Sequence, residues 1–157
     1  MKKITQYYVG VILILMILSS CSSNNNSDQG VFKYKGSYIG DNSAVGNIIN
    51  RLPYSKEFRE VSLQTQKKPY GMIIQYGDVA GNIKNDVVNN ATYIFVLIKN
   101  ADWITFNFPN KKYTLTRQQL QKWYGEDLNK INDEKEIKKL IQTNLNDANK
   151  VSKLLKK

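Results

Sequence analysis

Residues 85–108 read NDVVNNATYIFVLIKNADWITFNF, and this stretch decides the fold. Five of its apolar residues follow the period of one helical face: Val87, Ala91, Ile94, Phe95 and Ile98. Residues 93–98 are also compatible with a buried strand, but the length of the whole pattern favours a largely buried helix over 85–100, with Asn85 or Asp86 as its N-cap. Apolar and polar residues then alternate, which predicts a strand over 103–108.

On the amino-terminal side, the chain predicts a shorter helix and a hairpin. Residues 31–39 resemble a short extended segment. Apolar positions then follow a helical period over 43–52, where Asn42 or Ser43 is the natural N-cap and Pro53 ends the helix. Residues 60–66 and 70–76 have strand character and are separated by the turn Lys67-Lys68-Pro69.

On the carboxyl-terminal side, residues 112–115 return as a partner strand for 103–108. Thr116 and Gln119 form a capping box that starts a helix, and Gly125 ends it. The sequence therefore predicts an α+β domain with a mainly antiparallel four-stranded sheet and helices on one face, in the order α-β-β-α-β-β-α.

Residues 131–157 form a charged segment with an amphipathic helical pattern. Acidic residues lie near its start and lysines near its end, an arrangement that complements the helix dipole. Its apolar stripe has three possible partners, which are anionic lipid, the globular domain itself and another protein.

The first residues have the pattern of an export signal. Lys2 and Lys3 precede an apolar run over 9–18, which is shorter than the roughly 20 residues of a membrane-spanning helix. Leu18-Ser19-Ser20-Cys21 follows and resembles a bacterial lipobox. The resemblance implies cleavage between Ser20 and Cys21 and a lipid on the Cys21 sulfur, so that the protein is anchored to the outer face of the cytoplasmic membrane.

This pattern divides the chain into four parts. Residues 1–20 are predicted to be the signal peptide, and 21–30 the lipidated cysteine with a polar, flexible tether. Residues 31–130 are predicted to form the globular domain, and 131–157 the amphipathic helix.

Composition excludes several functional classes. The chain has no histidine and one cysteine, so the commonest general base, a disulfide and a thiolate metal site are not available, and we expect no metal or cofactor. There are 23 Lys and Arg against 13 Asp and Glu. This excess favours anionic lipid or a cell-wall polymer as a partner. The sequence has no base-reading motif, and we expect no nucleic-acid partner.

Two stretches supply candidate binding residues. The first is a loop before a helix, in which Tyr38, Asp41, Asn42 and Ser43 either hold a ligand or form a turn and N-cap. The second is the helix after Thr116, which carries Arg117 and Trp123, residue types that recur at binding hot spots and also in cores. In both cases the structural interpretation is favoured.

The sequence contains no recognisable catalytic motif. Glu126 and Asp127 are adjacent carboxylates, which seldom face each other across a substrate. The prediction is therefore a non-enzymatic binding or sensory module of the cell envelope. A protein–protein assembly factor and a histidine-free enzyme that acts on envelope polymers are the alternatives.

Four stretches resemble one family of small Gram-positive lipoproteins that share an extracellular domain of unknown function. They are YKGSYIGDNSAVGNIINRLP (34–53), KPYGMIIQY (68–76), NATYIFVLIKNADWITFNF (90–108) and YTLTRQQLQKWYG (113–125). The resemblance covers about Phe32 to Asp127. It implies a shared fold and surface location, and no particular activity.

Overall fold

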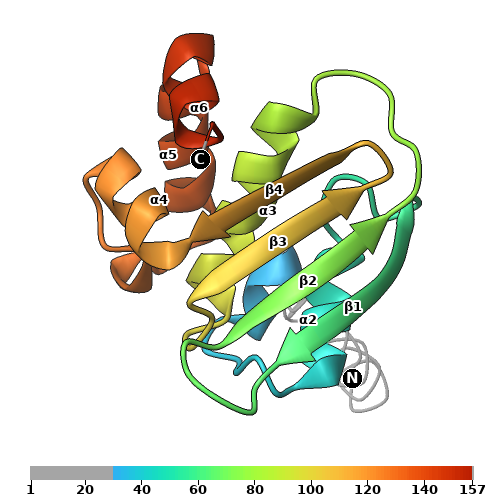
Figure 1. The fold of residues 1–157 in the computed structure, drawn as a ribbon. Helices are drawn as coiled ribbons and strands as arrows, with labels where there is room; N and C mark the ends of the chain where they lie inside the picture. The colour runs from blue at the N-terminus through green and yellow to red at the C-terminus, as the bar shows by residue number, and fades with distance from the viewer. Residues whose placement is uncertain (1–29, 157) are drawn as a thin grey trace, which may run out of the picture. The chain divides into compact units, whose positions relative to one another are not determined.

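The structure is a computed structural model that describes residues 30–156 and confirms the predicted α+β class (Figure 1). The helices are α2 (Asn42–Ile49), α3 (Ile83–Leu97), α4 (Arg117–Tyr124), α5 (Glu134–Leu145) and α6 (Ala148–Leu154), with short 3-10 helices η1 (Gly30–Tyr34) and η2 (Leu128–Lys130). The strands are β1 (Phe58–Gln64), β2 (Gly71–Tyr76), β3 (Trp103–Phe108) and β4 (Lys111–Thr116). Ser20 and Cys21 lie outside the described residues.

The sheet consists of two hairpins placed side by side in the order β1-β2-β3-β4. Each hairpin is antiparallel, as predicted, but β2 and β3 at the centre are parallel. Parallel neighbours need a crossover connection, and α3 provides it. The long buried helix in the middle of the sequence therefore determines how the two hairpins join.

Helices α2 and α3 cover one face of the sheet, as predicted (Figure 1). Alternate strand residues point into this layer, and Met72, Ile74, Ile104 and Phe106 are fully buried there. Figure 1 shows no described helix over the opposite face. We call that surface the open face. Its side chains are mostly polar and pair across strands, as between Asn107 Nδ2 and Gln75 Oε1 at 2.6 Å.

The amino-terminal segment differs from the prediction, because residues 30–34 form the 3-10 helix η1 and not an extended strand. Gly30 and Gly36 have positive φ angles of 47° and 87°, which favour a turn at each end of the segment. Only Ser37 makes a strand-like contact, an isolated parallel bridge to Ile98.

The first residues of α2 and α3 differ from the prediction because a residue earlier in the sequence is the N-cap of each helix. Asp41, not Asn42 or Ser43, is the N-cap of α2, since its Oδ1 accepts from Ala44 N at 2.9 Å. Asn82 caps α3, which therefore starts before the predicted residue 85. The helix α4 begins and ends as predicted, with a capping box at Thr116 and a left-handed Gly125.

The carboxyl-terminal segment forms two helices and not the single amphipathic helix that was predicted. The break falls at Asn146-Asp147, where Asp147 Oδ1 accepts from Asn149 N and Lys150 N at 3.0 Å each and starts α6. A competing N-cap inside a periodic sequence is what divides the helix. Ile137, Ile141 and Val151 are buried, so the apolar stripe packs on the domain, which was one of the predicted alternatives.

Candidate functional site

The predicted site residues occupy three separate settings in the structure. The loop with Tyr38, Asp41, Asn42 and Ser43 lies at the start of α2. Arg117 lies against the end of α3, and Trp123 lies beside α6. They do not form one composite site.

The loop before α2 is mainly a helix start. Asp41 satisfies a free amide of α2, and Ser43 Oγ accepts from Asn47 Nδ2 at 3.5 Å. Tyr38 is different, because 55% of it is exposed and Lys99 Nζ lies 3.8 Å from the centre of its ring. The capping interpretation therefore accounts for Asp41, while Tyr38 remains available at the surface.

Arg117 is a structural residue that holds the carboxyl end of α3. Its guanidinium donates to the carbonyl oxygens of Phe95 at 2.6 Å, Ile98 at 2.6 Å and Ala101 at 2.9 Å. It also donates to Asn129 Oδ1 at 3.1 Å. A cation at a helix carboxyl end satisfies free carbonyl groups and the helix dipole together. These contacts use Arg117 for folding and leave little for a ligand.

Burial lowers the pKa of the Arg117 guanidinium, while the charges of Asp102 and Asp127 act in the opposite direction. A cavity of about 610 Å³ lies beside Arg117 and includes Trp103. The Trp103 ring covers Gly71 so closely that a Cβ at Gly71 would lie 2.0 Å from it. Two of the residues that bound this cavity, Arg117 and Trp103, are therefore held in place by the fold.

Trp123 lies in a groove between α4 and α6 that we call the basic groove. It is lined by Gln119, Lys122, Trp123, Lys150, Lys153 and Leu154, and its volume is about 470 Å³. Lys150 Nζ lies 4.7 Å from the centre of the Trp123 ring, and Trp123 Nε1 donates to the Lys150 carbonyl oxygen at 3.4 Å. The contact with Lys150 thus fixes the indole at the groove.

The electrostatic character of the basic groove is uniform. Three of its lining residues are lysines and none is acidic. Lys150 Nζ also donates to Asn144 Oδ1 at 2.6 Å, so it is held in place. Lys122 and Lys153 are exposed, and neither is in an ion pair within residues 30–156. The groove is therefore lined by two lysines without an ion pair, one lysine that is held in place and one aromatic ring, which suits an anionic ligand.

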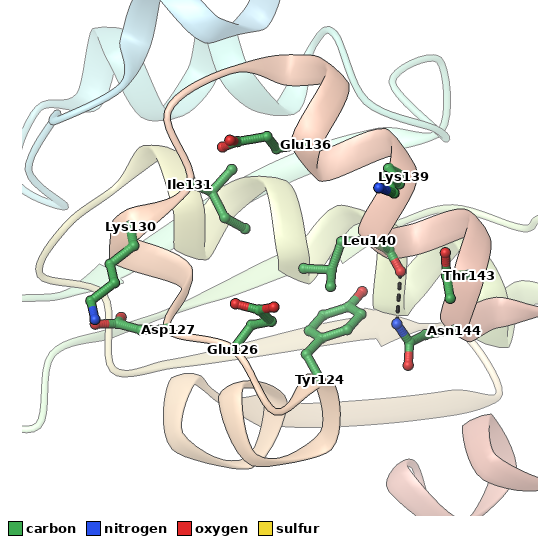
Figure 2. A pocket seen from close by; sticks show the side chains of 10 residues that line it. All are labelled: Tyr124, Glu126, Asp127, Lys130, Ile131, Glu136, Lys139, Leu140, Thr143 and Asn144. Carbon is green, nitrogen blue, oxygen red and sulfur yellow. Dashed lines mark hydrogen bonds between the residues drawn. The ribbon is translucent and has the colours of Figure 1, made fainter.

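Figure 2 shows a second cavity of about 560 Å³, between the end of α4 and α5. Tyr124, Ile131 and Leu140 supply apolar surface, and charged side chains stand around them. Two of these charged side chains, Asp127 and Glu136, have structural partners. Asp127 Oδ1 accepts from Asn129 N at 3.0 Å, and Glu136 Oε2 accepts from Asn132 N at 2.7 Å.

The adjacent acids Glu126 and Asp127 both line this second cavity. Asp127 is the N-cap of η2, and Glu126 follows the glycine that ends α4. They are consecutive residues on one connection and do not face each other from opposed elements.

Trp123 was a predicted candidate residue, whereas the three lysines of the basic groove were not. Lys122 is the direct neighbour of Trp123, which was a local signal. Lys150 and Lys153 join the groove only because α6 folds back beside α4. The break before α6 makes this placement possible, and it was not predicted because the segment was expected to form a single helix.

Within residues 30–156, no helix is both long and apolar enough to cross a membrane. In the same range, no three His, Cys, Asp or Glu side chains gather in a way that would hold a metal ion.

The fold and the basic groove together define a small α+β domain with a cationic surface site. Residues 31–118 match the family described as "Domain of unknown function (DUF4825)", and the chain belongs to this family. No curated protein and no solved structure shows significant similarity to it. The matched residues include all of η1 except Gly30, together with the sheet, α2 and α3, whereas Trp123 and the lysines of the groove follow the matched segment.

Proposed function

We propose that the protein is a lipid-anchored, non-enzymatic binding module on the outer face of the cytoplasmic membrane. The anchor rests on the Leu18-Ser19-Ser20-Cys21 pattern after a short apolar run. The partner is an anionic, phosphate-bearing polymer of the cell envelope, and it binds in the basic groove.

One observation carries the proposed binding site, namely the convergence of Lys122, Lys150 and Lys153 around Trp123 without an acidic lining residue. Lysine binds phosphate as a mobile point charge. Unpaired cations in one groove raise the local concentration of an anionic partner. The Trp123 ring adds an apolar surface for the uncharged part of the polymer.

The positions of the lysines favour an extended anion over a single small one. Lys150 and Lys153 are three residues apart and so lie about one turn apart on α6, while Lys122 comes from α4. Three cations on two helices match several phosphates along a polymer better than one isolated group. Such binding is screened by salt because the charges are near the surface.

The structural roles of several acidic residues favour a binding function over a catalytic one. Asp41, Asp133 and Asp147 each accept a backbone N–H at the start of a helix. Asp86 accepts from the Tyr54 hydroxyl at 2.6 Å, and Asp102 from Tyr70 N at 2.7 Å. Carboxylates used in this way stabilise the fold and are not presented as paired acid and base.

The test is binding of the full mature chain to poly(glycerol phosphate), with neutral dextran for comparison. The groove variant is Lys122→Gln with Lys153→Gln, since neither lysine forms an ion pair in the described structure. The matched control is Lys111→Gln with Lys112→Gln, which removes the same charge from exposed residues of β4. We expect the groove variant to bind roughly tenfold or more weakly and the control to lose much less.

Equal losses in the two variants would show that net charge alone, and not the groove, drives binding. No binding of the unaltered chain to the phosphate polymer at low salt would contradict the proposed partner. Breakdown of the polymer by the purified chain would contradict the absence of catalysis.

A further inference from the structure

The residues that follow the tether form a cationic and aromatic surface that we call the N-terminal surface. It comprises Lys33, Tyr34, Tyr38, Arg51 and Lys99. Lys33 Nζ and Arg51 Cζ lie 5.2 Å and 5.4 Å from the centre of the Tyr34 ring, and Lys99 Nζ lies 3.8 Å from that of Tyr38. Each tyrosine thus carries at least one cation against its ring.

Backbone contacts hold the two halves of this surface together. Ser37 N donates to the Tyr34 carbonyl oxygen at 3.1 Å, and Lys99 N donates to the Ser37 carbonyl oxygen at 3.0 Å. Tyr38 is the one large hydrophobic residue that is exposed within residues 30–156. Two acids are near this surface in the sequence: Asp41, which follows Tyr38 by three residues, caps α2, and Asp102, which follows Lys99 by three residues, accepts from Tyr70 N. The surface is therefore a fixed, net-positive feature of the fold.

The length of chain before the surface limits its distance from the proposed anchor. Cys21 and Val31 are ten residues apart in the sequence. A chain extends by at most about 3.6 Å per residue, so Val31 lies within roughly 35 Å of the Cys21 lipid. A domain of this size is itself about 35 Å across, so the side next to Val31 reaches the bilayer most easily.

We propose that the N-terminal surface docks on the anionic surface of the membrane and orients the domain there. This inference rests on the lipid anchor of the proposed function. Tyrosine and the long basic side chains are the residue types that membrane–water interfaces favour, with the ring at the headgroups and the charge near phosphate. Lysine and arginine near a membrane are attracted by anionic lipid, and salt weakens the attraction.

This orientation is consistent with the proposed polymer site. Figure 1 shows α6 well separated from the light-blue segment that contains η1. The basic groove includes residues of α6 and none of the N-terminal surface, so docking through that surface does not occupy the groove.

The test places a fluorescent reporter on the lipidated full-length chain in vesicles. Tyr38→Cys and, as a second position, the exposed Asn50→Cys carry the fluorophore, while Thr114→Cys on the open face is the control. The native Cys21 sulfur is occupied by lipid, so the reporter attaches at the introduced thiol. A spin label on the lipid headgroup quenches reporters that lie close to the membrane.

We expect quenching at positions 38 and 50 to exceed quenching at 114 at least threefold in vesicles that contain phosphatidylglycerol. The difference should shrink in pure phosphatidylcholine, and in the variant with Lys33, Arg51 and Lys99 all changed to Gln. Equal quenching at the three positions, with the chain still in the membrane fraction, would overturn the docking and leave the anchor intact. A chain absent from the membrane fraction would overturn both the anchor and the docking.

Discussion

Arg117 Nη2 donates to the carbonyl oxygen of Ile98 at 2.6 Å, and this contact ties the start of α4 to the end of α3. The same guanidinium reaches the Phe95 carbonyl oxygen and the side chain of Asn129. One side chain therefore terminates the central helix and fixes the position of the chain that leads to the basic groove.

Replacing Arg117 should be among the most destabilising changes outside the apolar core. We expect Arg117→Met to lower the free energy of unfolding by about 2–4 kcal/mol, because buried carbonyl oxygens lose their donors. Arg117→Lys should recover only part of the loss, since an ammonium cannot reach the same carbonyl groups in a planar fork. Urea unfolding measures the effect, with the exposed Lys122→Met on the same helix as the control. A change below about 1 kcal/mol would contradict the structural role.

The sequence could predict those elements whose signals are local. The capping box at Thr116 and Gln119 and the stop at Gly125 are read from a few neighbouring residues, and α4 matches them. The alternation over 103–108 likewise matched β3.

The prediction failed where distant or competing contacts decide. Residues 31–39 have no clear apolar period. Their position depends on the pairing of Ser37 with Ile98, which is distant in the sequence. The apolar stripe continues past Asp147 and so predicts one unbroken helix. The neighbouring residues do not show that Asp147 acts as an N-cap and starts a second helix. The parallel pairing of β2 with β3 follows from the path of α3, which spacing does not encode. The basic groove could not be predicted for the same reason, because it joins α4 to α6.

Gln121 offers a stabilising substitution. Its side-chain oxygen Oε1 is buried and has no hydrogen-bond partner among the described residues. A buried acceptor without a donor is unfavourable, so Gln121→Met should raise the free energy of unfolding by about 1 kcal/mol. Thermal and urea unfolding would show it. Gln118→Met, at an exposed position of the same helix, should change stability by less than about 0.5 kcal/mol. A less stable Gln121→Met variant would indicate a polar partner for the amide.

Stability should fall at alkaline pH because of buried tyrosines. Burial raises the pKa of Tyr124 to about 12, against the smaller opposing effect of its hydrogen bond with Thr92. Burial also raises the pKa of Tyr76 to about 12. In the unfolded chain tyrosine ionises near pH 10. Above that pH the folded state holds more protons than the unfolded state, so the free energy of unfolding decreases up to about pH 12.

Tyr124→Phe isolates this effect. At neutral pH, the free energy of unfolding of this variant should be about 1 kcal/mol lower than that of the unaltered protein, because the 2.8 Å hydrogen bond between Tyr124 and Thr92 is removed. Between pH 10 and pH 12, the free energy of unfolding of the variant should decrease less steeply than that of the unaltered protein. Tyr38→Phe, at an exposed ring, is the control. If the free energy of unfolding decreased equally steeply with pH in Tyr124→Phe and in the unaltered protein, Tyr124 would not contribute to the alkaline loss of stability.

The anchor is tested by Cys21→Ala in intact cells. The substitution removes the sulfur that the lipid modifies, so we expect incorporation of radioactive fatty acid to be abolished. The protein should also leave the tightly held membrane fraction, apart from a portion retained by an uncleaved signal. Ser22→Ala is the matched control and should label normally. Equal labelling of Cys21→Ala and the unaltered protein would refute the anchor.

The central claim, that the basic groove binds the anionic polymer, is tested most directly by the two indole N–H signals of the nitrogen-15-labelled protein. Trp123 lies in the groove, and Trp103 lies in the cavity beside Arg117. On titration with poly(glycerol phosphate) at low salt, we predict that the Trp123 signal shifts and saturates while the Trp103 signal stays in place. The Lys122→Gln/Lys153→Gln variant should need roughly tenfold more polymer to reach the same shift. A shift of Trp103 alone, or of neither signal, would contradict the account.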